Sequence, residues 1–231
     1  MFSCKAKTEN EYQSIDINSQ LREVTSLQDK NNFLSANKLL ESLVRKKPDN
    51  AELYFRLAHS KTISNPELFE IIKLLDQCLK INPMHSKALY LKSQGLMFMG
   101  KFKDALEIEN KLLERFPDNF ILKADKASTL LFNGDFKKAI EFAKSILPET
   151  ENIYEIERLT RVQIYANYFL GNIEKVKVGK DKLRQLGFET DYLNKLIDSK
   201  DLKFENFAVG KNVGNVPCSL QQLNIMFSKK E

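Results

Sequence analysis

The sequence has little of what most secreted proteins and metalloproteins depend on. Among 231 residues there is no tryptophan, and there are only two histidines, three cysteines, eight glycines and six prolines. Cys4, Cys78 and Cys218 are odd in number and far apart, so they offer neither a disulfide framework nor a metal-ligand spacing. No apolar run approaches the roughly 18 residues that a membrane helix needs, and the first residues lack the apolar stretch of a secretory signal. We therefore expect a cytoplasmic protein in a reducing compartment, without a membrane segment.

An excess of charge of one sign is also missing. The chain has 36 lysines and arginines against 31 acidic residues, a net charge of +5, and the two signs alternate along nearly its whole length. The densest basic cluster, residues 45–47, directly precedes Pro48 at a predicted helix end, where cations complement the helix dipole. No block is basic enough to neutralise a row of phosphates, so nucleic acid is not the expected partner.

Candidate catalytic groups are equally scarce. His59 falls in a predicted helix and His85 at a predicted helix junction, and neither has a cysteine or carboxylate at the spacing of a metal site or of a nucleophile and its base. Cys78 falls in the apolar stripe of a helix, where a thiol acts as a small apolar side chain. The sequence predicts no enzyme, no metal site and no cofactor.

An internal repeat is what the sequence does contain. Residues 100–106, GKFKDAL, recur 34 residues later as residues 134–140, GDFKKAI. Pro83 and Pro117 are also 34 residues apart, and Pro48 precedes Pro83 by 35. This period, with glycine, aromatic and alanine in fixed order, resembles the tetratricopeptide-repeat family. In that family the glycine closes a first helix, the aromatic packs in the joint, and the alanine lets a second helix approach closely.

The resemblance implies an all-α fold, a right-handed superhelical solenoid of about five helix-turn-helix repeats with a C-terminal capping helix and tail. Stacking of neighbouring repeats supplies the core that one helix pair lacks. The repeat domain is expected over 17–190, with repeats at about 17–50, 51–84, 86–119, 120–150 and 152–188.

The two ends differ from the repeats. Residues 1–16 are polar and aperiodic and are expected to be disordered. Residues 191–231 are expected to form a capping helix, started by Thr190 and Asp191, and then an apolar tail. We expect the tail to dock on the repeats, either at the end of the fifth repeat or in the groove, through its four apolar residues Leu220, Leu223, Met226 and Phe227.

A binding surface follows from the resemblance, because the family's first helices line the concave side of the superhelix. We expect a protein or peptide partner to bind there, in the groove, through Tyr90, Gln94, Met97, Phe98, Leu131, Phe132, Arg161 and Tyr165. Phe98, Phe132 and Phe169 each stand two residues before a repeat glycine, where the family usually has a polar residue. They form either an aromatic ladder on the open groove or part of the core between the helices.

The predicted function is therefore an adaptor or chaperone-like module for protein–protein interaction. The family's carboxylate clamp is not expected, because among its matching positions only Lys87 has the required residue. A nucleic-acid-binding helical repeat protein and a regulatory subunit of an enzyme on another chain are the alternatives. The first helix, residues 17–29, has a polar outer face, so we expect a monomer.

Overall fold

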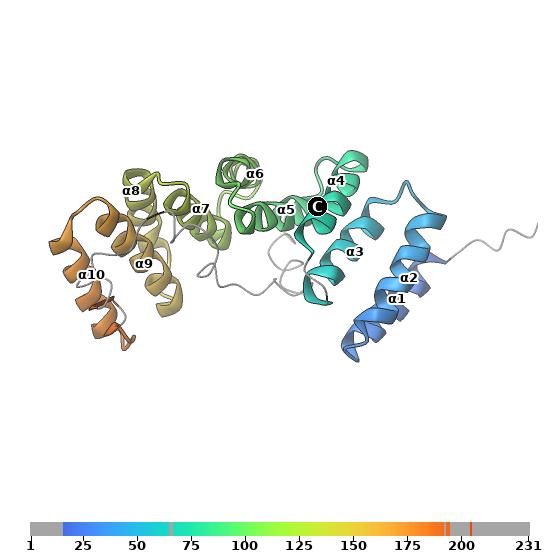
Figure 1. The fold of residues 1–231 in the computed structure, drawn as a ribbon, viewed down its shortest axis with the longest axis horizontal. Helices are drawn as coiled ribbons and strands as arrows, with labels where there is room; N and C mark the ends of the chain where they lie inside the picture. The colour runs from blue at the N-terminus through green and yellow to red at the C-terminus, as the bar shows by residue number, and fades with distance from the viewer. Residues whose placement is uncertain (1–15, 65–66, 192, 195–203, 205–231) are drawn as a thin grey trace, which may run out of the picture.

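The protein is all-helical in the part of the chain that this computed structural model describes, residues 16–64, 67–191, 193–194 and 204 (Figure 1). Of the predicted segment 1–16 only Asp16 is described, and most of the predicted cap and tail also lies outside those residues. The described part contains ten α-helices and one short 3-10 helix and no strand: α1 (Ile17–Asp29), α2 (Phe33–Lys46), α3 (Ala51–Ser64), α4 (Leu68–Ile81), α5 (Ser86–Phe98), α6 (Phe102–Arg115), α7 (Phe120–Phe132), α8 (Phe136–Ile146), η1 (Leu147–Glu149), α9 (Ile153–Phe169) and α10 (Ile173–Gln185).

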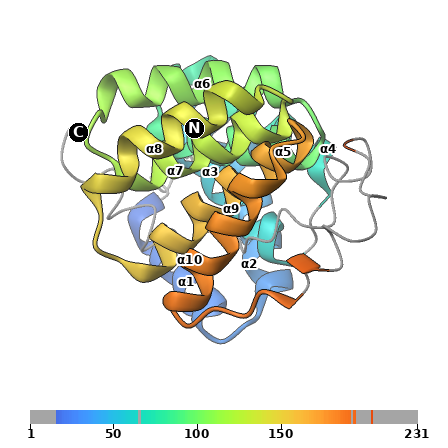
Figure 2. The same ribbon diagram turned by 90° about the vertical axis from the view of Figure 1, so that its left-hand side faces the viewer.

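The helices form five antiparallel pairs stacked in one row. Each α-helix packs on its neighbours in sequence, and the first helices α5 and α9 also pack on α3 and α7, respectively. Figure 1 shows an arch with α1 and α2 at one end, α9 and α10 at the other, and α4, α6 and α8 along its outer edge. Figure 2 shows the same arch from the end formed by α9 and α10. This is the predicted α-solenoid.

Each first helix begins at a side-chain cap. A cap oxygen or ring nitrogen accepts a hydrogen bond from a backbone N–H in the first turn, which has no partner inside the helix. The capping residues are Asp16 before α1, Asn50 before α3, His85 before α5, Asn119 before α7 and Asn152 before α9. These polar residues, together with the prolines that precede several of them, set the start of each repeat.

In repeats one, three, four and five, the turn inside the repeat is set by a residue with positive φ. Gly100 (φ 71°) and Gly134 (φ 80°) end the first helices of repeats three and four, as the sequence predicted. The residue after each glycine donates its N–H to a carbonyl five residues back, Lys101 to Leu96 and Asp135 to Leu130. That closure satisfies carbonyl groups at the helix end and reverses the chain into the second helix. Asn31 does the same in repeat one with φ 56°.

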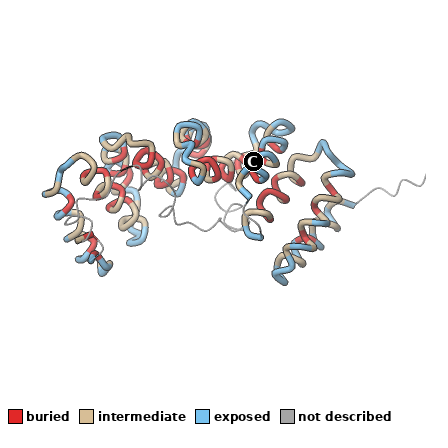
Figure 3. Tube along the Cα trace, viewed as in Figure 1, coloured by how far each residue is buried: buried red, intermediate tan, exposed pale blue. Residues whose placement is uncertain are grey.

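The core lies between the helices of successive pairs. Figure 3 shows buried residues along the inside of the stack and exposed residues on its outer rim. Ala105, Ala139 and Val176 occupy the small position of their second helices and are fully buried, which lets each pair close tightly. First helices α5 and α7 each bury eight residues, whereas second helices α6 and α8 bury three each. The first helices are therefore sandwiched, and the second helices keep one face in water.

Candidate interaction surface

The eight residues predicted to bind a partner divide into two groups. Gln94, Arg161 and Tyr165 are half-buried, and Phe98 is 40% exposed. The other four are buried in the core and present almost no surface to a partner: Tyr90, Met97, Leu131 and Phe132. These four residues therefore do not line an open groove. Each first helix is packed between neighbouring helices, and those helices cover its inward-facing side chains.

Two of the three phenylalanines that precede a repeat glycine, Phe132 and Phe169, lie in the joints between repeats. Phe132 stacks on Phe102 of the preceding repeat, with 5.9 Å between ring centroids and 22° between planes. Phe169 stacks in the same way on Phe136, at 5.2 Å and 23°. Rings two residues before the glycine thus face the first residue of the preceding repeat's second helix. Of the two interpretations left open by the sequence, the core position holds for Phe132.

Asp125 on α7 joins three consecutive first helices. Its Oδ2 accepts hydrogen bonds from the Tyr90 hydroxyl at 3.0 Å and the Gln94 amide at 3.3 Å, both from α5. Its Oδ1 accepts a hydrogen bond from Nη2 of Arg158 on α9, which also contacts the Ser128 hydroxyl at 3.3 Å. Only 9% of the Asp125 side chain is exposed, so its charge depends on these partners.

Arg158 is the outer member of this network. Its side chain stays 31% exposed. Burial lowers the pKa of Arg158, but the charge and hydrogen bond of Asp125 outweigh that effect and hold the pKa above its usual value. Arg161 lies one turn further along α9 and pairs with Glu157. Tyr165 lies two turns further along, and burial raises its pKa. We call this set the first-helix face: Gln94, Asp125, Ser128, Arg158, Arg161 and Tyr165.

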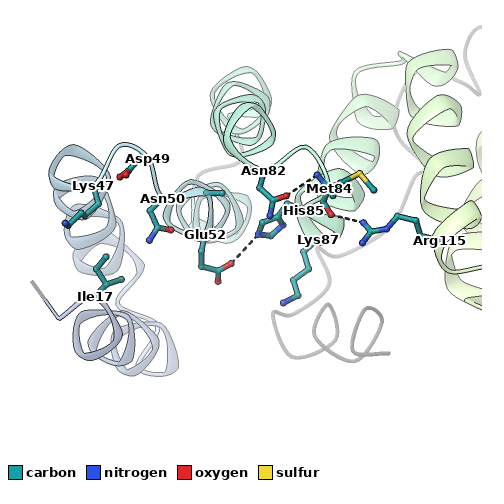
Figure 4. A pocket seen from close by; sticks show the side chains of 11 residues that line it. Ile17, Lys47, Asp49, Asn50, Glu52, Asn82, Met84, His85, Lys87 and Arg115 are labelled. Atoms are coloured by element: carbon teal, nitrogen blue, oxygen red, sulfur yellow. Dashed lines mark hydrogen bonds and ion pairs between the residues drawn. The ribbon is translucent and has the colours of Figure 1, made fainter. Parts of the chain in front are cut away.

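A second polar site lies near the other end of the row. A cleft of about 740 Å³ opens at the starts of α3 and α5, and its lining includes Glu52, His85, Lys87 and Arg115 (Figure 4). The His85 Nδ1 accepts the Ala88 N–H at 3.2 Å, so the ring proton sits on Nε2, which lies 3.3 Å from Glu52 Oε2. Glu52 also pairs with Arg56, and both partners lower its pKa against the opposing effect of burial.

The sequence matches no protein-family model and no curated protein. Solved structures match over most of the chain. A MamA double mutant (RS-1) shares 14% identity at a TM-score of 0.64, over 74% of this chain and 93% of the other. MamA from Desulfovibrio magneticus RS-1 shares 14% sequence identity at a TM-score of 0.62, and the match covers 80% of this chain and 97% of that protein. A kinesin light chain homologue of Podospora anserina with TPR-like repeats shares 15% sequence identity at a TM-score of 0.59, and the match covers 73% of this chain and 93% of that protein. The fold is a tetratricopeptide-repeat solenoid.

The sequence pointed to the tetratricopeptide fold but missed two key residues of its first-helix face. Asp125 and Arg158 were not among the eight predicted residues, although they connect two of them, Tyr90 and Gln94. A signal was available: the two have opposite charges and lie 33 residues apart, almost one repeat, both on first helices. Equivalent positions of neighbouring repeats are close in space, so such a pair predicts an ion pair between repeats.

Within the described ranges, no three histidine, cysteine or carboxylate groups come together as a metal site would require. Burial raises the pKa of the Cys78 thiol to about 12, so this cysteine stays protonated and is a poor nucleophile. In the same residues, no helix has the length and apolar character to cross a membrane.

Proposed function

We propose that this solenoid is a protein-interaction scaffold that binds a polypeptide segment along its first-helix face. The observation that carries the proposal is the Asp125 network, which ties the first helices of three consecutive repeats together and leaves Arg158 partly exposed. A groove built on such a fixed frame loses little conformational entropy when a ligand binds.

The chemistry of this face favours a ligand with carbonyl or carboxylate oxygens. The guanidinium groups of Arg158 and Arg161 each have five N–H donors in a planar fork, and both side chains are about one-third exposed. Gln94 adds an amide, and Tyr165 adds an aromatic edge one turn beyond Arg161. An extended peptide backbone with an acidic or aromatic side chain has the complementary groups.

Selection from a displayed peptide library against the full-length protein tests this function. We expect Arg161→Ala to weaken the selected peptides by about tenfold, the loss of a typical interface anchor. Lys138→Ala is the matched control, because it also removes one cation but lies on α8 at the outer edge, with a 71% exposed side chain. Equal effects of the two variants, or none from either, would show that the peptides bind elsewhere.

The same selection separates an adaptor from a chaperone-like module. An adaptor enriches one consensus motif, whereas a chaperone-like module enriches many unrelated apolar segments. The alternatives have their own readouts. RNA bound with a steep salt dependence would support a nucleic-acid-binding repeat protein, and copurification with an active enzyme would support a regulatory subunit.

A further inference from the structure

Phe204 lies in an aromatic joint at the turn of repeat four. Its ring centroid is 5.1 Å from that of Phe136, with the planes at 88°, and 5.2 Å from that of Phe169, with the planes at 77°. Phe136 and Phe169 stack on each other, so Phe204 meets both members of the pair edge to face. Edge-to-face contact is a favoured geometry for aromatic rings. The joint therefore offers Phe204 two oriented contacts instead of a general apolar surface.

Gly134 lies directly against the ring of Phe204 in this joint. A Cβ on Gly134 would lie 3.4 Å from Cε1 of Phe204, so the ring rests directly over the glycine backbone. A side chain that extended from this Cβ toward Phe204 would meet the ring. The glycine thus serves both the reversal of the chain, through its φ of 80°, and the space for Phe204.

An equivalent joint occurs one repeat earlier. Gly100, Phe102 and Phe132 stand 34, 34 and 37 residues before Gly134, Phe136 and Phe169, and the rings of Phe102 and Phe132 stack in the same way. Within the described part of the chain, no atom lies within 4 Å of a Cβ built on Gly100. The earlier joint therefore provides an internal comparison for the one that holds Phe204.

The chain reaches Phe204 from a second point of attachment. Leu193 is fully buried with Ile164, Val176 and Leu183, in the cluster between α9 and α10. Its neighbour Asn194 accepts a hydrogen bond from Lys180 on α10. Ten residues after Asn194, Phe204 lies at the turn of repeat four, so Leu193 and Phe204 contact the solenoid at two separate places.

We propose that the joint formed by Gly134, Phe136 and Phe169 is a docking site for a phenylalanine side chain, and that its occupant is Phe204 of the same chain. Docking gives the chain a contact with the solenoid beyond that of Leu193. Because the occupant is on the same chain, its effective concentration is high, and a phenylalanine from another polypeptide competes poorly while Phe204 is in place. The docking of Phe204 does not depend on the function proposed for the first-helix face.

A peptide added in trans tests the site. A labelled peptide of residues 198–210 is titrated, by fluorescence anisotropy, into full-length wild type and full-length Phe204→Ala. We expect the peptide to bind the variant at least about tenfold more tightly, because the empty joint no longer has its intramolecular competitor. The same peptide with Phe204→Ala should not bind. Equal binding to the two proteins, or no binding to a variant that circular dichroism shows to be folded, overturns the proposal.

A glycine pair supplies the matched control and a readout that does not need Phe204→Ala to fold. Asparagine tolerates positive φ, and Asn31 already holds this position in repeat one with φ 56°. Gly134→Asn places its amide against Phe204, whereas Gly100→Asn has no described neighbour to displace. We expect Gly134→Asn to speed tryptic cleavage after Lys200 and Lys203 by about tenfold, as local opening governs proteolysis. Unchanged cleavage in Gly134→Asn, or an equal rise in Gly100→Asn, contradicts the docking site.

Discussion

Glu109 on α6 and Thr129 on α7 hydrogen-bond across the interface of repeats three and four, with 2.8 Å between Glu109 Oε1 and Thr129 Oγ1. Both side chains are fully buried. Burial raises the pKa of Glu109 to about 8, so the carboxyl is neutral at pH 7. The Thr129 hydroxyl donates to Glu109 Oε1, which lowers this pKa and so only partly offsets the effect of burial.

This raised pKa makes stability depend on pH. Between about 4.5, the ordinary pKa, and about 8, the folded protein binds a proton at Glu109 that the unfolded chain releases. The contribution of Glu109 to the free energy of unfolding is thus complete below pH 4.5 and declines as the pH rises through 8. Glu109→Gln keeps the shape without the titration. In urea unfolding, we expect the free energy of unfolding of Glu109→Gln, relative to wild type, to increase by more than about 1 kcal/mol between pH 5 and pH 9.

Glu107→Gln is the control for this pH dependence. It lies on the same helix and removes the same charge, but its side chain is exposed. Its difference from wild type should stay flat across that pH range. A flat difference for Glu109→Gln as well would mean that Glu109 is ionised in the folded protein.

The Asp125 network predicts a large loss of stability from a change of one atom. In Asp125→Asn the amide replaces a carboxylate oxygen, so one of the donors from Tyr90, Gln94 and Arg158 loses its acceptor and Arg158 loses its counter-charge. We expect the free energy of unfolding to fall by about 2–3 kcal/mol, as for a buried hydrogen bond to a charge. Asp118→Asn, which is exposed, should change it by less than about 0.5 kcal/mol. Similar losses in the two variants would disprove the structural role of the network.

The role of His85 as the N-cap of α5 can be tested by replacing it with asparagine, a common N-cap residue. Asparagine caps α7 and α9 at the equivalent positions Asn119 and Asn152. His85→Asn should therefore keep the Ala88 N–H satisfied and the stability close to wild type. His85→Ala should lose about 1 kcal/mol, the usual value of an N-cap, in thermal unfolding. Equal losses would indicate that His85 acts through Glu52 instead.

The sequence predicted the fold well because the fold repeats locally. A glycine and an alanine at fixed spacing specify the turn and the close helix pair without long-range information, and Gly100, Ala105, Gly134 and Ala139 take those roles here. The surface was harder to predict, because exposure depends on which neighbouring helix covers a residue. Phe132 lies in the register of a groove residue and is still buried by Phe102 from the preceding repeat.

Two glycines inside helices give the last prediction. Gly179 on α10 faces Ile164 on α9, and a Cβ there would lie 2.6 Å from Ile164 Cγ1. Ile164 is 1% exposed and is held by Val176 and Leu183, so it cannot move away. Overpacking of this kind costs roughly 1–3 kcal/mol, which exceeds the gain of about 1 kcal/mol that alanine brings to a helix. Gly179→Ala should therefore be less stable than wild type in urea unfolding.

Gly95 on α5 provides the matched comparison, since its Cβ would meet Ile72 Cδ1 at 2.9 Å. That atom is the free end of a half-buried side chain, which can turn aside at small cost. Gly95→Ala should therefore match or exceed the stability of wild type, by up to about 1 kcal/mol, because the helix propensity of alanine outweighs the contact. If Gly179→Ala were as stable as Gly95→Ala, α9 and α10 would have to be able to separate, and the tight closure of repeat five would be wrong.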